Sequence, residues 1–159
     1  MANDTGGKRA DSGSRVIKAP PQTIYRAFLD PEAVVSWRPP EGMKARIHAF
    51  DPRKGGTFRM SFTYPDTGHR TRGKTSEHAD VFRERFLELI PNERTVELVE
   101  FETDDPAFAG AMTVTTTMAP TFDGTKVTIL CENVPSGIRA DDHEAGIRST
   151  LQNLAAFTE

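Results

Sequence analysis

The chain has 159 residues, with 20 Lys and Arg against 23 Asp and Glu, so its formal net charge is −3. This length fits one domain that can bury its own core. The small acidic excess argues against a nucleic-acid binder, which normally carries a basic surplus, and against a polybasic membrane surface. No apolar stretch approaches the ~20 residues needed to span a bilayer.

The single cysteine, Cys131, excludes an internal disulfide and a cysteine-based zinc site. The four histidines show no metal-ligand spacing, so we expect no metal and no cofactor. The N-terminal residues contain no apolar core of a signal peptide. A reducing, cytoplasmic compartment is therefore expected.

The N-terminal segment is rich in Gly, Ser, Asp, Lys and Arg. This composition predicts a disordered tail over residues 1–13, followed by a single domain over residues 14–159. The domain opens with a short predicted strand at 14–19.

Two short helices are predicted next. Prolines at 20 and 21 suit a first helical turn, and Ile24, Ala27 and Phe28 then recur at i, i+3 and i+4. Asp30 as N-cap and Pro31 at the first helical position start the second helix. Prolines at 39 and 40 end it.

The central part of the chain reads as antiparallel strands joined by short loops. The predicted strands are 44–50, 57–64, 80–90, 95–102, 111–118 and 126–134. The second of these alternates cleanly and places Phe58, Met60, Phe62 and Tyr64 on one face. Segment 80–90 is compatible with either a strand or a helix.

The C-terminal segment is helical, with Asp141 as its expected cap and Ile147, Leu151 and Leu154 along one apolar stripe. Strands grouped together with helices set apart indicate an α+β fold: one antiparallel sheet with the long helix against one face. The loops between strands are too short for parallel crossovers.

Residues 68–75, GHRTRGKT, match the phosphate-binding pattern G-x-x-x-x-G-K-[ST]. A true site of this kind follows a buried, continuously apolar parallel strand, whereas 57–64 alternates. Only the residues after 75 remain to build a parallel sheet, and they contain hairpin turns instead. We therefore interpret the match as a polar hairpin loop, with a nucleotide site as the alternative.

Charged side chains alternate along two strands that we expect to be neighbours. Ion pairs on a solvated face are one interpretation; the other is that Arg85 or Glu97 points into a cavity and orients a ligand. Cys131 shows no trace of the base or oxyanion hole that a nucleophile needs, so a buried, inert thiol is favoured.

Segment 37–43, WRPPEGM, places an aromatic residue, two prolines and a glycine in one short stretch. Such a stiff loop beside a sheet is either a packed corner or a gate at a cavity mouth, since pockets often use aromatic side chains. Trp37 and Met43 are the gate candidates.

The ordered set of segments 15–43, 50–60, 85–101, 124–135 and 142–157 resembles the START-like, or SRPBCC, helix-grip superfamily. Within it, the chain is similar to the group of homologues of the activator of the ninety-kilodalton heat-shock protein ATPase. The resemblance spans most of residues 15–157.

The resemblance implies a curved antiparallel sheet of about six to seven strands that grips the C-terminal helix, with 80–90 as a strand. It also implies a cavity between sheet and helix. Members bind apolar or amphipathic small molecules, some are cyclases or hydrolases, and one branch docks on the chaperone. That branch carries an extra N-terminal domain, which we do not expect in this chain. The family carries no universal catalytic residue, so none is assigned here.

The leading hypothesis is a ligand-binding domain, with catalysis weak or absent. Its alternatives are a module that docks on a heat-shock ATPase, a cyclase or hydrolase that uses a carboxylate such as Glu97, and a nucleotide binder. The expected partner is an apolar small molecule; a chaperone or a second copy of the chain is the other candidate. The predicted ligand-binding residues are Trp37, Met43, Phe58, Met60, Phe62, Tyr64, Arg85, Glu97, Met112, Val114, Ile147 and Leu151.

Overall fold

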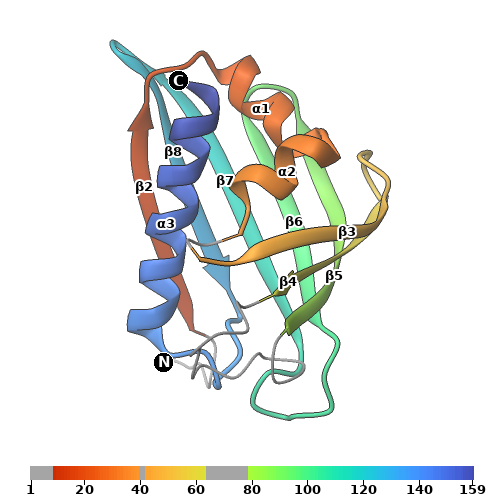
Figure 1. Ribbon diagram of the computed structural model, residues 1–159. Coiled ribbons are helices and arrows are strands. Elements are labelled where there is room, and N and C mark those ends of the chain that lie inside the picture. Colours follow the sequence, from red (N-terminus) through yellow and green to blue (C-terminus); the bar gives the residue numbers. More distant parts are fainter. Residues whose placement is uncertain (1–8, 40–41, 64–78) are drawn as a thin grey trace.

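The computed structural model describes residues 9–39, 42–63 and 79–159. Within these ranges the chain forms a seven-stranded sheet in the order β2-β8-β7-β6-β5-β4-β3. Every neighbouring pair is antiparallel. The helices lie on one face of the sheet, and β3 and β4 curl round towards them (Figure 1). The predicted α+β class is confirmed.

The strands follow the predicted segments closely. They are β2 (Ala10–Ile17), β3 (Lys44–Phe50), β4 (Thr57–Thr63), β5 (Ala79–Ile90), β6 (Arg94–Phe101), β7 (Ala111–Thr121) and β8 (Gly124–Glu132). The helices are α1 (Pro21–Leu29), α2 (Pro31–Trp37) and α3 (Ala140–Thr158).

The start of α2 is as predicted. The side chain of Asp30 accepts a hydrogen bond from the backbone N–H of Glu32 at 3.0 Å, and Pro31 occupies the first turn. This arrangement satisfies one of the backbone donors that a helix N-terminus leaves unpaired.

The predicted cap of α3 is wrong. The helix begins one residue before Asp141, and the residue at its N-cap, Arg139, makes no side-chain capping bond. The Arg139 guanidinium holds both oxygens of Asp141, at 3.3 and 3.2 Å. Asp141 also accepts from the backbone N–H of Asp142. These contacts occupy the carboxylate that was expected to close the helix end.

The first strand starts earlier than predicted, because residues 10–13 belong to β2 rather than to a tail. Gly13 explains the difference. A Cβ at this position would lie 2.8 Å from Cγ2 of Ile147 in α3. The glycine content of this segment predicts disorder, but Gly13 is the small residue that allows α3 to lie directly against β2.

The ambiguous segment 80–90 lies in strand β5, as the family resemblance implied. Phe82, Glu84 and Phe86 are buried on one face, and Arg83 and Arg85 are exposed on the other. The buried Glu84 interrupts the row of apolar side chains on the inner face, so the alternation typical of a strand is hard to recognise in the sequence.

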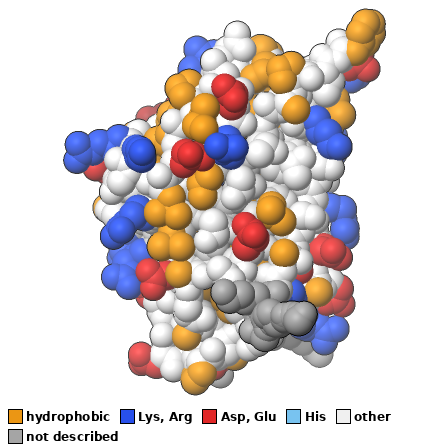
Figure 2. Space-filling model, turned by 180° about the vertical axis from the view of Figure 1, so that it is seen from behind, with side chains coloured by type: hydrophobic (Ala, Val, Ile, Leu, Met, Phe, Trp, Pro, Cys, Tyr) orange, Lys and Arg blue, Asp and Glu red, His pale blue; other side chains and the backbone are white. Residues whose placement is uncertain are grey.

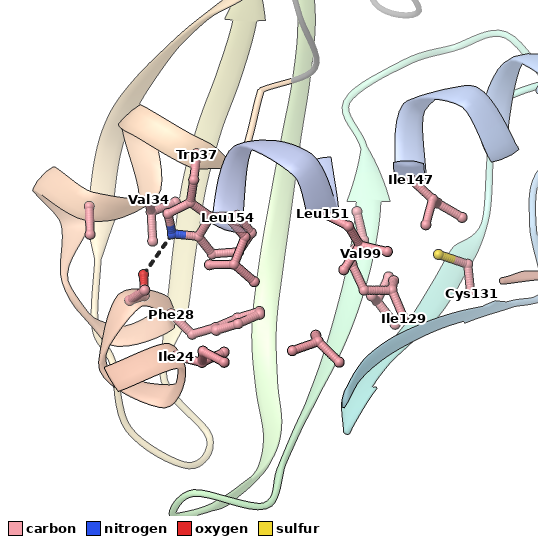
Figure 3. Packing of buried hydrophobic residues seen from close by; sticks show 14 of the residues in the cluster. Ile24, Phe28, Val34, Trp37, Val99, Ile129, Cys131, Ile147, Leu151 and Leu154 are labelled. Carbon is pink, nitrogen blue, oxygen red and sulfur yellow. Dashed lines mark hydrogen bonds between the residues drawn. The ribbon is translucent and has the colours of Figure 1, made fainter. Parts of the chain in front are cut away.

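The core lies between the helices and the inner face of the sheet. Figure 3 shows Trp37 from α2 beside Phe28 from α1, with Leu154 of α3 close to Trp37 and Leu151 of the same helix beside Val99. The Trp37 indole N–H donates a buried hydrogen bond to the carbonyl oxygen of Ala27 at 2.9 Å. The opposite face of the molecule shows scattered hydrophobic and charged side chains (Figure 2).

Candidate ligand-binding cavity

A cavity of about 670 Å³ lies between the inner face of the sheet and α3. Strands β4 to β8, the C-terminal ends of α1 and α2 and the N-terminal half of α3 contribute to its wall. The volume falls in the range of small-molecule sites. Most of the lining side chains are apolar, among them Phe28, Val99, Met112, Val114, Ile129, Ile138 and Ile147.

Aromatic side chains from three neighbouring strands form one part of this wall. Phe82 in β5 makes edge contacts with Phe62 in β4 and Phe101 in β6, with ring centroids 4.9 and 6.0 Å apart. Phe62 and Phe101 are only partly buried. The two outer rings of the aromatic row therefore reach the surface.

Trp37 forms another part of the wall and is almost fully buried. Its ring lies 4.6 Å from that of Phe28. Helix α3 fixes the backbone that follows: Thr150 donates to the carbonyl oxygen of Arg38 at 3.2 Å, and Asn153 to that of Pro39 at 2.9 Å. This start of the 37–43 segment is thus a packed corner that also lines the cavity.

The corner directs Arg38 into a buried ion cluster with two glutamates. Arg38 Nη2 lies 3.0 Å from both carboxylate oxygens of Glu84, and Nη1 lies 3.2 Å from Oε2 of Glu97. The two glutamates come from β5 and β6, and each is about 2% exposed or less. All three side chains belong to the cavity wall.

One guanidinium does not balance two carboxylates. Burial raises the pKa of Glu84 well above its usual range; Arg38 opposes this shift, and Glu97 adds to it. Burial lowers the pKa of Arg38, but the two carboxylates outweigh it and the net shift is upward. Part of the effect of Glu97 is a hydrogen bond between the two carboxyl groups, which favours the protonated form of Glu84.

A second polar contact lies on the wall near the start of α3. His143 Nδ1 lies 2.7 Å from Oδ2 of Asp11, and Arg9 Nη2 lies 3.0 Å from the same oxygen. Asp11 is buried in β2. The contact joins the first strand to the first turns of the last helix, and it leaves His143 on the cavity side.

Cys131 in β8 also lines the cavity and is buried, as predicted. Burial raises the pKa of its thiol to about 12, an effect that Arg38 opposes and the nearby carboxylates strengthen. The thiol is therefore protonated at neutral pH. Because the thiolate is the reactive form, this cysteine is a poor nucleophile.

The structure brings seven of the predicted site residues to the cavity wall: Trp37, Met43, Phe62, Glu97, Met112, Val114 and Ile147. Four others lie off the wall. Phe58, Met60 and Leu151 are buried in the core, where Phe58 packs against the ring of Phe86 at 5.1 Å. Arg85 is exposed on the outer face of β5. Tyr64 and the 68–75 motif lie outside the described residues.

Sequence reasoning missed Arg38, Glu84 and His143. The position of Glu84 could be predicted from the sequence, because Phe82, Glu84 and Phe86 alternate along the strand and so share its inner face. Arg38 directly follows Trp37, but nothing in the sequence tells which way its side chain turns. His143 has no local motif around it, and its partner Asp11 lies far away in the sequence, in a segment whose composition predicts a tail.

Two further kinds of site are not seen in the described ranges. There, no group of three or more His, Cys, Asp or Glu side chains is placed to hold a metal ion. No helix among the described elements is long and apolar enough to cross a membrane.

A curved antiparallel sheet around a long C-terminal helix, two short helices after the first strand and a cavity between them define a START-like helix-grip domain. The model of the family "Activator of Hsp90 ATPase homolog 1-like protein" matches residues 18–159, and the chain belongs to this family. No curated protein matches the chain.

Solved structures of bacterial proteins share the fold. A protein from Chromobacterium violaceum is 35% identical, with a TM-score of 0.82 over 94% of this chain and 96% of that one. Proteins from Rhodobacter sphaeroides and Arthrobacter aurescens are 17% and 16% identical, with TM-scores of 0.73 and 0.75. They cover 95% and 94% of this chain and 92% and 85% of their own.

Proposed function

We propose that the protein binds an apolar or amphipathic small molecule in the cavity between the sheet and α3. The observation that carries the proposal is the cavity itself: about 670 Å³ of space with a mainly apolar wall. Transfer of apolar surface from water contributes about 25 cal/mol per Å². A ligand of moderate size can therefore offset the cost of association.

The polar groups of the wall would orient such a ligand. They are few and clustered, as in most small-molecule sites. Arg38, Glu84 and Glu97 form one cluster, and His143 lies apart from it near the start of α3. The predicted contacts of Trp37, Phe62 and Ile147 with the ligand belong to the same proposal.

A thermal-shift panel tests the proposal. The panel contains fatty acids, steroids, flavonoid-like aromatics and polyketide-like compounds, with Mg-ATP in a separate well. A ligand that binds only the native state raises the melting temperature by mass action. A rise with one apolar class supports cavity binding. A rise with Mg-ATP alone, or no rise with any compound, contradicts it; Mg-ATP would point to the 68–75 motif instead.

A second candidate function is a cyclase or hydrolase acting on a hydrophobic substrate. The raised pKa of Glu84 favours it, since a carboxyl that holds its proton to higher pH is better suited to act as a general acid. Turnover of any panel compound that Glu84→Gln abolishes while binding persists would support this function. Turnover that the variant leaves unchanged would exclude Glu84 from it.

The family description also names an activator of a chaperone ATPase. Docking on such an ATPase, and a cytoplasmic location, are proposals that rest on the family and on the sequence, with no feature of the cavity behind them. Added at saturation, the protein should raise the rate of ATP hydrolysis by the chaperone if it docks in this way. An unchanged rate would contradict that partner.

A further inference from the structure

A histidine and an aspartate form a largely buried pair beside the cavity, near the start of α3. The register of β2 against β8 places Asp11 opposite Cys131, a residue of the cavity wall. Nδ1 of His143 lies 2.7 Å from Oδ2 of Asp11. The side chain of Asp11 is 5% exposed and that of His143 is 16% exposed. The pair therefore lies at the border between the core and the cavity.

The packing of α3 on β2 fixes this geometry. Asp11 and Gly13 lie two residues apart in a strand and so share one of its faces. His143 and Ile147 lie four residues apart in a helix and so share one of its faces. A Cβ at Gly13 would lie 2.8 Å from Cγ2 of Ile147, so the two elements are in close contact. The same contact places the imidazole of His143 on the carboxylate of Asp11.

Asp11 sets which ring nitrogen of His143 carries the proton. A carboxylate only accepts hydrogen bonds, so Nδ1 donates to it and, in the neutral ring, Nε2 keeps its lone pair. The charge of Asp11 is already matched by Arg9, whose Nη2 lies 3.0 Å from the same carboxylate oxygen. A positive charge on the imidazole is therefore not needed to balance this aspartate.

The other ring nitrogen of His143 is available to a ligand. Within the described residues Nε2 makes no hydrogen bond, and it is not one of the unpaired polar atoms that are fully buried there. The side chain of His143 also belongs to the cavity wall. Nε2 is thus an acceptor at the edge of a mainly apolar cavity, and the bond from Nδ1 to Asp11 holds the ring in place.

From this oriented imidazole and its unpaired nitrogen we infer that the ligand carries a neutral hydroxyl group, which donates a hydrogen bond to Nε2 of His143. The inference rests on the proposed function and adds the chemical class of the ligand. A carboxylate has no proton to donate to a neutral ring. An ammonium group has protons, but it loses its hydration in an apolar cavity and the neutral imidazole offers no opposite charge in return.

The test compares three molecules with one hydrocarbon body: 4-propylphenol, 1-fluoro-4-propylbenzene and 4-propylbenzoate. Fluorine is close to a hydroxyl group in size but donates no hydrogen bond. Titration calorimetry at pH 8, the alkaline end of the range in which histidine side chains change charge, gives each dissociation constant. The phenol should bind about fivefold more tightly than the fluoro compound, which is the contribution of one typical hydrogen bond. The benzoate should bind most weakly.

The variant His143→Leu removes the acceptor and keeps the wall apolar. The phenol hydroxyl would then be buried without a partner, so the fluoro compound should bind more tightly than the phenol. The ratio of the two affinities should change by at least about fivefold. His48→Leu is the matched control, because it makes the same substitution at an exposed histidine of β3 outside the described cavity wall. It should keep the wild-type preference.

A second measurement on the wild-type protein locates the hydrogen bond even if His143→Leu does not fold. The protein is labelled with isotopic nitrogen in its histidines, and the NMR resonance of Nε2 of His143 is followed during titration. The resonance should shift when 4-propylphenol saturates the cavity, because a hydrogen bond to this nitrogen changes its electronic environment. The fluoro compound should shift it much less.

The outcomes separate the two proposals. Equal or tighter binding of the fluoro compound or the benzoate by wild type would overturn the hydroxyl inference and leave cavity binding standing. An unchanged ratio in folded His143→Leu, or an Nε2 resonance that the phenol does not shift, would do the same. Saturable binding of none of the three molecules would overturn the inference and also contradict the proposed function.

Discussion

Arg38 Nη2 lies 3.0 Å from both carboxylate oxygens of Glu84, and the two residues come from separate layers of the fold. Arg38 directly follows α2, whereas Glu84 is in β5 on the inner face of the sheet. The contact therefore connects the helical layer to the sheet across the cavity wall, at a place where solvent does not screen it.

The first prediction concerns pH. The native pKa of Glu84 is raised above its ordinary value of 4.5, so the native state binds more protons than the unfolded state as pH rises past 4.5. The free energy of unfolding must then fall until pH passes the native pKa. In Glu84→Gln this fall between pH 5 and pH 8 should be smaller by at least about 1 kcal/mol, measured by urea unfolding.

Glu100→Gln serves as the control for that measurement, because Glu100 is an exposed carboxylate in β6. It should keep the wild-type slope. A wild-type slope in Glu84→Gln, or stability that rises more steeply with pH in wild type than in the variant, would contradict the assignment.

The second prediction removes the cation. Arg38→Met leaves two buried carboxyl groups without their partner, a change that typically costs about 3–5 kcal/mol. We expect a loss of this size in urea unfolding at pH 7, reduced at pH 5 because protonation relieves the unpaired charge. Substitution of the exposed Arg85 by Met should change stability by about 0.5 kcal/mol or less. Equal effects of the two variants would mean that the ion cluster does not stabilise the fold.

The third prediction compares two glycines. A Cβ at Gly146 in α3 would meet no atom within 4 Å, so Gly146→Ala should stabilise the helix by about 0.5–1 kcal/mol. A Cβ at Gly13 would lie 2.8 Å from Ile147, so Gly13→Ala should destabilise by about 1–3 kcal/mol. Thermal unfolding of both variants checks the prediction, and the same sign for both would contradict this packing of α3.

The fourth prediction concerns the indole of Trp37. Trp37→Phe removes the hydrogen bond to Ala27 and leaves a small void in the core, at an expected cost of about 2–4 kcal/mol. Phe157, an aromatic residue in α3, is half exposed. Phe157→Ala should therefore cost much less in the same urea titration. A Trp37→Phe variant as stable as wild type would show that the bond contributes nothing.

The sequence allowed the architecture to be predicted because apolar alternation and proline positions are local signals. Strand β4, the Asp30 cap and the apolar stripe of α3 all follow from residues close together in the chain. The start of β2 could not be predicted this way. There, Gly13 packs against Ile147, which lies more than a hundred residues away in the sequence. The composition of the segment alone predicts a disordered tail.

The candidate site was predictable only in its apolar part. Inward-facing side chains such as Met112 and Val114 follow from strand alternation. The ion cluster forms because the chain turns after α2 and directs the Arg38 side chain towards Glu84 in β5 and Glu97 in β6. No local sequence pattern predicts that direction. Charge alone makes Arg85 and Glu97 equal candidates for the cavity wall, but the sheet places Glu97 inside and Arg85 outside.

The most direct test of cavity binding uses Trp37, the one tryptophan in the chain and part of the cavity wall. Its fluorescence is followed during titration with 1-octanol, which does not absorb the exciting light. Three proteins are compared: wild type, Gly146→Leu, whose new side chain enters open space at the wall, and Ala156→Leu, which adds the same side chain at an exposed position of α3.

We predict a saturable change in emission for wild type and Ala156→Leu, and at least about fivefold weaker binding for Gly146→Leu, because filling a site removes the contact area that drives binding. No saturable change in wild type, or equal binding by all three proteins, would contradict the claim that this cavity is a ligand site.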